Sequence, residues 1–353
     1  MSGLLHPHSP FRIFAISGII SITVLSLVYF NLGWQAAFVA LMLVIIELTF
    51  SFDNAIINAR VLMKMSPFWQ KMFMTVGIFI AVFGMRIVFP ILIVMFSSGL
   101  PWDQVIGLAF NDPDHYAEVL HDAHPSIASF GGMFLLMLAL HFFFDVTREV
   151  QWFSKIEKPM QAIGRKWLHA LVCTMLLLLI VLHPANEHPQ EVLTAGLIGI
   201  GMYLLIHGAS ELFTMQHAKA EKKAGRKILQ QTGMAAFASF IYLEVLDASF
   251  SFDGVIGAFA VTKDVILIAA GLGIGALWVR SLTLFIVRRE VLNTYRYLEH
   301  AAHYVIAALA CTLLLGLFWE IPETMVGVLG MGMIALAISH SIRENKKDAA
   351  ASQ

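Results

Sequence analysis

The stretch Glu47-Leu-Thr-Phe-Ser-Phe-Asp53-Asn54 places two carboxylates inside an apolar run that is long enough to cross a bilayer. A charged side chain at the bilayer centre costs about 2.5–3.5 kcal/mol on insertion scales. On an unbroken helix Glu47 and Asn54 share one face, whereas Asp53 lies about 120° away from Glu47. We therefore expect either an interruption of the helix near Ser51–Asn54 or separate partners for the two acids.

A related stretch, Asp247-Ala-Ser-Phe-Ser-Phe-Asp253-Gly254, occurs in the second half of the chain. Its two acids align with the two acids of the first stretch, and Phe-Ser-Phe keeps the same register. Glu244 adds a fifth acid nearby. If the first helix is interrupted, we expect Gly254 to help a matching break in the second, because glycine weakens a helix interior.

The composition is that of a membrane protein. Hydrophobic residues make up 58% of the 353 residues and charged residues only 13%, against about 25% charged in soluble domains. A helix needs about 20 apolar residues to span a bilayer. The sequence therefore predicts an all-α polytopic membrane protein with about ten transmembrane helices, at 12–32, 35–59, 72–98, 127–145, 169–183, 192–212, 231–260, 265–287, 301–318 and 324–341.

The basic residues alternate along the chain. Of the 23 Lys and Arg, 20 lie in six segments: 1–12, 60–71, 146–168, 213–230, 288–299 and 342–353. The positive-inside rule places these segments, and both termini, in the cytoplasm. We therefore expect a multi-pass protein of a bacterial inner (plasma) membrane. Arg86 and Arg280 lie inside predicted spans, and we expect them to balance the charge of the acids; direct gating or substrate exclusion is the alternative role.

The two acidic stretches are predicted to run antiparallel across the membrane, because they lie on the second and the seventh spans. The two intramembrane arginines obey the same offset of five spans. This pattern predicts two inverted repeats of about five helices each, an architecture typical of secondary transporters. The first repeat covers 1–183, with its motif helix at 35–59 and an external loop rich in acids and histidines at 99–126; the second covers 184–353, with its motif helix at 231–260.

The ligand types of the acidic stretches indicate a hard cation. Carboxylate, hydroxyl and amide oxygens, without Cys or Met in the motifs, favour Mn²⁺, Ca²⁺ or Mg²⁺ over Zn²⁺ or Cu⁺. Converging acids would carry more charge than one divalent ion neutralises, so that arginines or protons must balance the remainder. The predicted metal ligands are Glu47, Asp53, Asn54, Glu244, Asp247 and Asp253.

Three further patterns carry predictions. His141 with Asp145, and His207 with Glu211, stand at i, i+4 near the cytoplasmic side and could relay protons; a packing or interfacial role is the alternative. The glycines of Gly271-Leu-Gly-Ile-Gly275 are typical of close helix approach. The basic segment 146–168 is typical of a helix on the anionic inner leaflet.

The stretch 47–54 resembles the Glu-x-x-Leu-Ser-x-Asp-Asn pattern of the TerC family of integral membrane proteins, with Phe50 in place of Leu. The stretch 247–254, together with Leu277-Trp-Val-Arg280, is similar to the second-half signature of that family, although Gly254 replaces the usual serine. The resemblance implies membership of the LysE-like transporter superfamily in a less characterised branch. It also implies export of manganese or a related divalent cation and a link to tellurium resistance.

We therefore expect an integral membrane transporter, not an enzyme, that exports Mn²⁺, or else Ca²⁺, by alternating access coupled to protons. Its expected partners are the lipid bilayer and the divalent cation, its substrate, with no organic cofactor and no nucleic acid; ion identity, transport direction and oligomeric state stay open. The alternative is a non-transporting membrane scaffold or assembly factor of a metal or tellurite stress-response complex, in which the acids form structural ion pairs. An intramembrane hydrolase is the third hypothesis.

Overall fold

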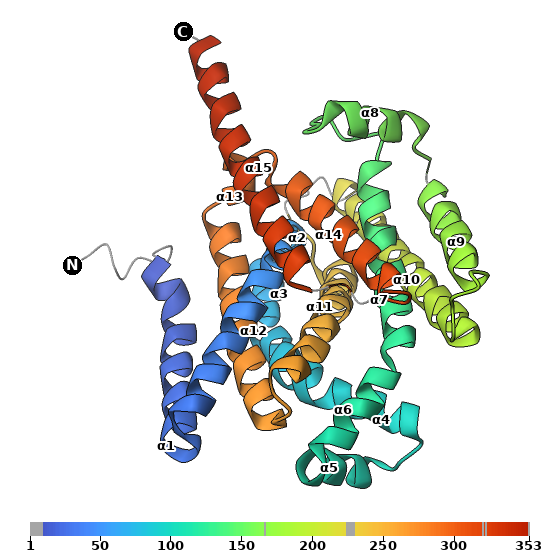
Figure 1. Cartoon of the computed structure of the whole chain (residues 1–353). Coiled ribbons are helices and arrows are strands. Elements are labelled where there is room, and N and C mark those ends of the chain that lie inside the picture. The colour runs from blue at the N-terminus through green and yellow to red at the C-terminus, as the bar shows by residue number, and fades with distance from the viewer. Residues whose placement is uncertain (1–9, 166, 224–229, 320, 322, 352–353) are drawn as a thin grey trace. The chain divides into compact units, whose positions relative to one another are not determined.

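The computed structural model describes residues 10–165, 167–223, 230–319, 321 and 323–351 (Figure 1). Each of the ten predicted spans coincides with one or more helices. The helices are α1 (Pro10–Phe50), α2 (Phe52–Leu62), α3 (Pro67–Met72), the π-helical segments η1 (Phe73–Gly77) and η2 (Ile80–Val88), α4 (Phe89–Ser98), α5 (Trp102–Asn111), α6 (Pro113–Asp122), α7 (His124–Phe143), α8 (Ser154–Ile163), α9 (Leu168–Val181), α10 (Pro189–Lys223), α11 (Gly233–Val261), α12 (Val265–Arg288), α13 (Val291–Thr294), α14 (Leu298–Leu315) and α15 (Glu323–Ala351).

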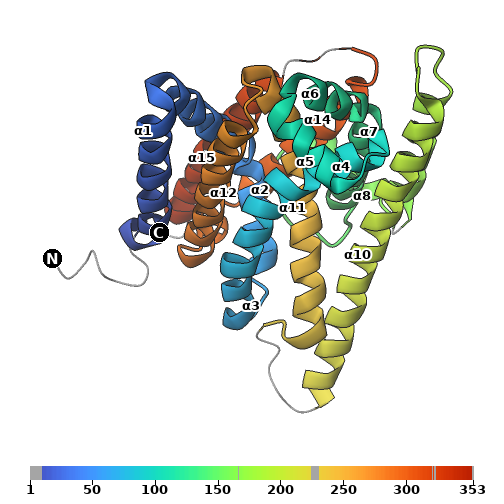
Figure 2. The same ribbon diagram turned by 90° about the horizontal axis from the view of Figure 1, so that it is seen from below.

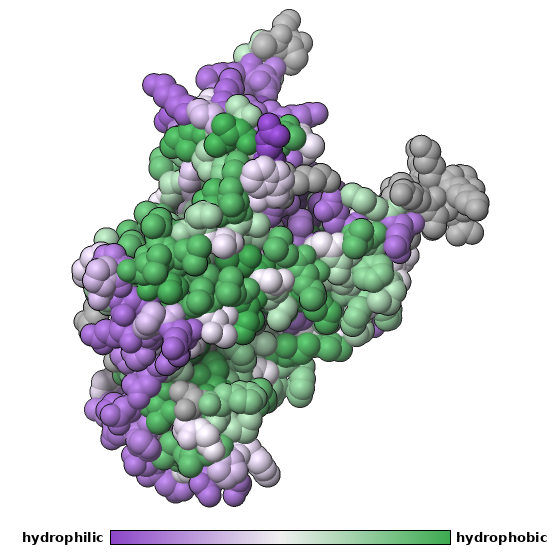
Figure 3. Space-filling view, turned by 90° about the vertical axis from the view of Figure 1, so that its right-hand side faces the viewer, coloured by the Kyte–Doolittle hydropathy of each residue, from purple (hydrophilic) through white to green (hydrophobic). Residues whose placement is uncertain are grey.

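The fold is that of an all-α polytopic membrane protein. Within the described ranges, eight helices are long and apolar enough to cross a bilayer, or nine if α8 and α9 form one broken span. The ten predicted spans differ from this number at two places: 12–32 and 35–59, the latter up to Phe50, are the two legs of α1, which counts as one helix, and 169–183 is α9, which has only 14 residues and counts as a span only together with α8. The two legs of α1 meet at Gly33, whose φ of +88° is a conformation that glycine adopts without strain (Figure 1). The surface seen in Figure 3 is largely hydrophobic, as lipid contact requires.

The chain forms two compact units. Unit 1 comprises residues 1–124 and 209–289, and unit 2 comprises 125–208 and 290–353. Each unit therefore draws segments from both halves of the sequence. The repeats predicted at 1–183 and 184–353 are a hypothesis about internal symmetry and do not correspond to these compact units. The inverted repeats stay a prediction.

In unit 1, α12 packs against α1, α2 and η2 and runs beside α1 (Figures 1 and 2). Two glycines of α12 allow this approach. A Cβ added at Gly271 would lie 2.5 Å from the Cβ of Leu43, and one added at Gly275 would lie 2.5 Å from the Cβ of Glu47. The prediction of close helix approach is confirmed, and its consequence is that Glu47 lies directly against α12.

The segment 99–126, predicted as an external loop, contains two short helices, α5 and α6, and its position outside the membrane stays a prediction. The Asp112 side chain caps α6 by accepting a hydrogen bond from the backbone N–H of His115 (3.3 Å), and Pro113 occupies the first turn. Each helix buries a pair of apolar residues four positions apart, which gives both a packed face. These pairs are Val105 with Ala109 and Tyr116 with Leu120.

In unit 2, the segment predicted to lie on the inner leaflet contains α8. This helix is held in place by its own buried acid, Glu157. Glu157 is fully buried, and its carboxylate lies 3.1 Å from the guanidinium of Arg148. It also accepts hydrogen bonds from the Tyr304 hydroxyl (3.2 Å) and from the backbone N–H groups of Trp152 and Phe153. The exposed face of α8 carries Lys155 and Lys158.

Candidate functional site

The helix of the first acidic stretch is interrupted at Ser51, which is one of the two alternatives that the sequence left open. Helix α1 ends at Phe50, Ser51 has φ −101° and ψ 14°, and α2 begins at Phe52. The backbone stays paired through the break, since Ser51 N–H donates to Glu47 O (3.0 Å) and Ala55 N–H donates to Ser51 O (3.2 Å). The interruption therefore leaves none of these backbone groups unsatisfied inside the membrane.

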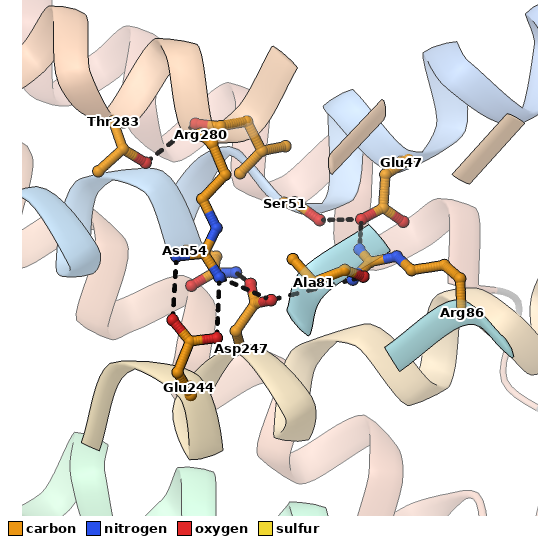
Figure 4. A network of polar contacts seen from close by, with 10 residues as sticks. Glu47, Ser51, Asn54, Ala81, Arg86, Glu244, Asp247, Arg280 and Thr283 are labelled. Atoms are coloured by element: carbon orange, nitrogen blue, oxygen red, sulfur yellow. Dashed lines mark hydrogen bonds and ion pairs between the residues drawn. The ribbon is translucent and has the colours of Figure 1, made fainter. Parts of the chain in front are cut away.

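Glu47 lies at the end of α1 and is buried against Arg86 of η2. The Arg86 guanidinium donates to the Glu47 carboxylate, which also accepts a hydrogen bond from the Ser51 hydroxyl (3.2 Å) (Figure 4). Arg86 also donates to the carbonyl oxygen of Ala81, five residues earlier (2.8 Å). The π-helical geometry of η2 thus supplies a backbone acceptor that orients the guanidinium.

A second arginine serves two acids of α11. The Arg280 guanidinium lies 3.4 Å from both carboxylate oxygens of Glu244 and 3.2 Å from Oδ2 of Asp247 (Figure 4). Its other contact is the ring of Phe73, whose centroid lies 3.8 Å from the guanidinium carbon in a cation–π arrangement. Arg280 is only 1% exposed. The cation is therefore held entirely by protein groups.

Asp247 joins the two arginine centres. Its Oδ2 lies 3.9 Å from the Arg86 guanidinium as well as near Arg280, and its Oδ1 accepts a hydrogen bond from the Asn54 amide (2.7 Å). The broken helix α1–α2, the segment η2 and the helices α11 and α12 thus meet at one buried polar cluster. We call it the acid–arginine cluster; it comprises Glu47, Asn54, Arg86, Glu244, Asp247 and Arg280.

Three residues of α2 carry buried oxygens without a hydrogen-bond partner in the described part of the chain. These atoms are Oδ2 of Asp53, Oδ1 of Asn54 and Oδ1 of Asn58, and the Asn58 amide nitrogen is equally unpaired. Buried polar atoms are nearly always paired, so each exception calls for a physical reason such as an absent ion or water. Asn58 is missing from the predicted ligands, although its spacing of four residues from Asn54 was the signal that could have found it.

The cluster and its surroundings carry an excess of negative charge. Among the described side chains, Glu47, Asp53, Glu244 and Asp247 are buried and Arg86 and Arg280 oppose them, which leaves a formal charge of −2 on these six groups when all are ionised. Among the described residues, no group of three or more His, Cys, Asp or Glu is arranged to hold a metal ion. The structure thus brings predicted ligands together as partners of Arg86 and Arg280; their role as ligands stays a prediction.

The second acidic stretch differs from its prediction. Helix α11 runs unbroken from Gly233 to Val261, so that the predicted break at Gly254 is wrong. One glycine costs about 1 kcal/mol in a helix interior, which packing on both sides offsets. A Cβ at Gly254 would lie 3.2 Å from Oε2 of Glu47, so that the glycine makes room for that carboxylate. The side chain of Asp253 lies outside the described residues.

The predicted histidine–acid pairs have different outcomes. Helix α7 ends at Phe143, so Asp145 does not follow His141 on a helix face; its carboxylate instead accepts hydrogen bonds from the backbone and hydroxyl of Thr147 (2.8 and 2.7 Å). That pairing was wrong because the helix stops before Asp145. His207 and Glu211 lie one turn apart on α10, as predicted.

The fold and the acid–arginine cluster define a polytopic membrane protein with a charged centre buried among its helices. The chain belongs to the family described as "Protein of unknown function (DUF475)", whose model matches residues 52–348. The matched region begins at the first residue of α2 and extends into α15. Comparisons with curated proteins and with solved structures gave no significant match.

Proposed function

We propose that the protein is a transporter that exports a hard divalent cation, first Mn²⁺ and second Ca²⁺, across the bacterial inner membrane, with both termini in the cytoplasm. The resemblance of both acidic stretches to the TerC family supports this proposal. In this role the cation is the substrate, and transport needs neither enzymatic activity nor an organic cofactor.

The observation that carries the proposal is the combination of excess negative charge and unpaired oxygens in unit 1. The formal charge of −2 on the six described groups would be balanced by one divalent cation, and the oxygens of Asp53, Asn54 and Asn58 are of the type that Mn²⁺ and Ca²⁺ prefer. Buried acids inside a membrane are expensive and mark ion pathways. A fixed structural network would instead be expected to satisfy its own polar atoms.

The arginines supply a mechanism for alternating between loaded and empty states. In the structure, Glu47 pairs with Arg86, and Asp247 pairs with Arg280. A cation bound by these carboxylates would compete with the guanidiniums for the same oxygens, so that binding and arginine release are linked. A ligand shifts a conformational equilibrium by its difference in affinity for the two states. Displacement of the arginines would provide that difference.

The proposal is tested by uptake of ⁵⁴Mn²⁺ into proteoliposomes that contain the purified full chain. We expect wild-type flux above protein-free vesicles and loss of that flux in Asp53→Asn, which removes the charge of a buried oxygen ligand while keeping its shape. Asp122→Asn is the matched control, because Asp122 is exposed on α6. Wild-type flux in both Asp53→Asn and Asp247→Asn would exclude these acids from transport.

A second candidate is the membrane scaffold or assembly factor of a metal or tellurite stress-response complex. It is favoured by the arginine pairing of Glu47, Glu244 and Asp247, which resembles a structural network. The charge swap Glu244→Arg with Arg280→Glu separates the candidates. A scaffold keeps its partners and its stress phenotype after the swap and shows no ion flux in vesicles, whereas a transporter loses flux.

A further inference from the structure

Unit 2 contains a cluster of ionisable rings that the proposed cation site does not use. His141 of α7 lies between two other histidines: its ring centroid is 4.4 Å from that of His207 on α10 and 5.0 Å from that of His169 on α9. The ring of Tyr203, one turn before His207, stacks on it at 5.3 Å with an interplanar angle of 6°. Three helices therefore bring four polar rings together.

These rings lie in a strongly apolar setting. Helices α7 and α10 are candidate membrane spans, and His169 and Tyr203 are buried, with 5% and 1% of their surface exposed. The α7 residues on the N-terminal side of His141 are a run of buried hydrophobic side chains from Met133 to Ala139. Polar side chains inside a membrane are expensive and face the interior of a bundle, where they mark ion and proton pathways.

Other titratable groups lie on the described parts of α7, α9, α10 and α14. On α14, His303 interacts electrostatically with His141, and its ring stacks on Phe142 at 3.7 Å. His300 lies in a separate network with Glu157 and Arg148. Helix α9 adds Cys173, and α10 adds Glu211 one turn beyond His207. Asp145 is turned toward Thr147.

The chemistry of adjacent imidazoles follows from these distances. A protonated imidazole is a double donor, and a neutral neighbour offers an acceptor nitrogen, so one proton can be shared within the cluster. Two protonated rings at such a distance repel each other in a setting with little water. The arrangement therefore favours a single excess proton over the three histidines, with protonation steps that belong to the group and not to one ring.

We propose that His141, His169 and His207, with the ring of Tyr203 stacked on His207, form a shared proton-binding site in unit 2. This site would hold the proton that the transported cation exchanges for, a step that rests on the proposed function. Asp145, one of the two acids expected from sequence spacing, is turned toward Thr147, and His169 joins the cluster as a third histidine, whereas Glu211 stays one turn from His207 on α10.

The proton site is tested by solid-state NMR on the full chain in lipid bilayers with ¹⁵N-labelled histidine. In the wild type, we expect the signals of the three clustered rings to change together in one protonation step. His207→Gln keeps a hydrogen-bond acceptor but removes one of the imidazoles that share the proton, so that the midpoint of the joint protonation step falls by about one pH unit. His188→Gln is the control, because His188 is exposed and pairs with Glu191 at 3.6 Å, outside the cluster. Independent titration of the three rings in the wild type, which needs no variant to fold, would overturn the proposal.

Coupling is tested in proteoliposomes that contain an internal pH dye and receive external Mn²⁺. We expect a proton flux opposite in direction to the Mn²⁺ flux. At a pH above the midpoint of the joint protonation step, His207→Gln should lower the proton flux about tenfold, because a shift of one pH unit changes the protonated fraction about tenfold. Unchanged proton flux in His207→Gln, with Mn²⁺ flux intact, refutes the coupling role and leaves the proposed function standing. Absence of wild-type Mn²⁺ flux refutes the proposed function, and the NMR titration still decides the proton site.

Discussion

Replacing Arg280 by methionine is the perturbation for which the structure gives the clearest magnitude. The guanidinium contacts the carboxylates of Glu244 and Asp247, which are 7% and 4% exposed, and lies over the ring of Phe73. Methionine fills the space but leaves two buried acids without this cation. Removal of one partner from a buried ion pair costs about 3–5 kcal/mol. We expect Arg280→Met to lower the free energy of unfolding by that amount.

The assay is equilibrium unfolding of the full chain in mixed micelles, followed by tryptophan fluorescence. Arg289→Met is the matched control, because Arg289 is exposed at the end of α12, and its cost should stay within about 0.5 kcal/mol. In a double-mutant cycle with Glu244→Gln, the two changes should be non-additive by about 0.5–3 kcal/mol. A loss below about 1 kcal/mol for Arg280→Met, or strict additivity, would refute the assignment of these groups to one buried ion-pair network.

Two further predictions concern helix approach and the anchoring of α8. Gly275→Ala should lower the free energy of unfolding by about 1–3 kcal/mol through overpacking, because the new Cβ would lie 2.5 Å from the Cβ of Glu47. Gly201→Ala is the control and should be tolerated in the same assay, because a Cβ at Gly201 meets no atom within 4 Å. Glu157→Gln should lower the free energy of unfolding by about 3–5 kcal/mol, because it leaves the Arg148 guanidinium without its carboxylate. The variant should also be cleaved faster by protease around α8, and equal cleavage of variant and wild type would contradict the anchoring role of Glu157.

Local patterns of the sequence predicted much of this fold. Apolar runs located the helices because a bilayer imposes a minimum length. The angular separation of Glu47 and Asp53 on a straight helix indicated a break near Ser51 as one of two alternatives. The close approach of α12 followed from its small residues at Gly271 and Gly275. Each of these inferences depends on groups that are neighbours in the sequence.

The remaining features depend on contacts between distant segments. Nothing local indicates that the Asp247 carboxylate would contact Arg86 and Arg280 together, or that His169 would approach His141. The break expected at Gly254 did not form, because a helix packed on both sides tolerates one glycine. Helices α5 and α6 were missed because their many polar residues suggested a loop, although a four-residue apolar spacing was present.

The role of the acid–arginine cluster is the central claim, and anomalous scattering from crystals of the full chain grown with Mn²⁺ tests it most directly. We predict a manganese peak within coordination distance of Asp53 Oδ2, with Arg86 or Arg280 withdrawn from its carboxylate partner. Crystals of Asp53→Asn grown in the same way should lack the peak. A wild-type map without a peak in unit 1, in which Glu47 still pairs with Arg86 and Asp247 with Arg280, would contradict the account.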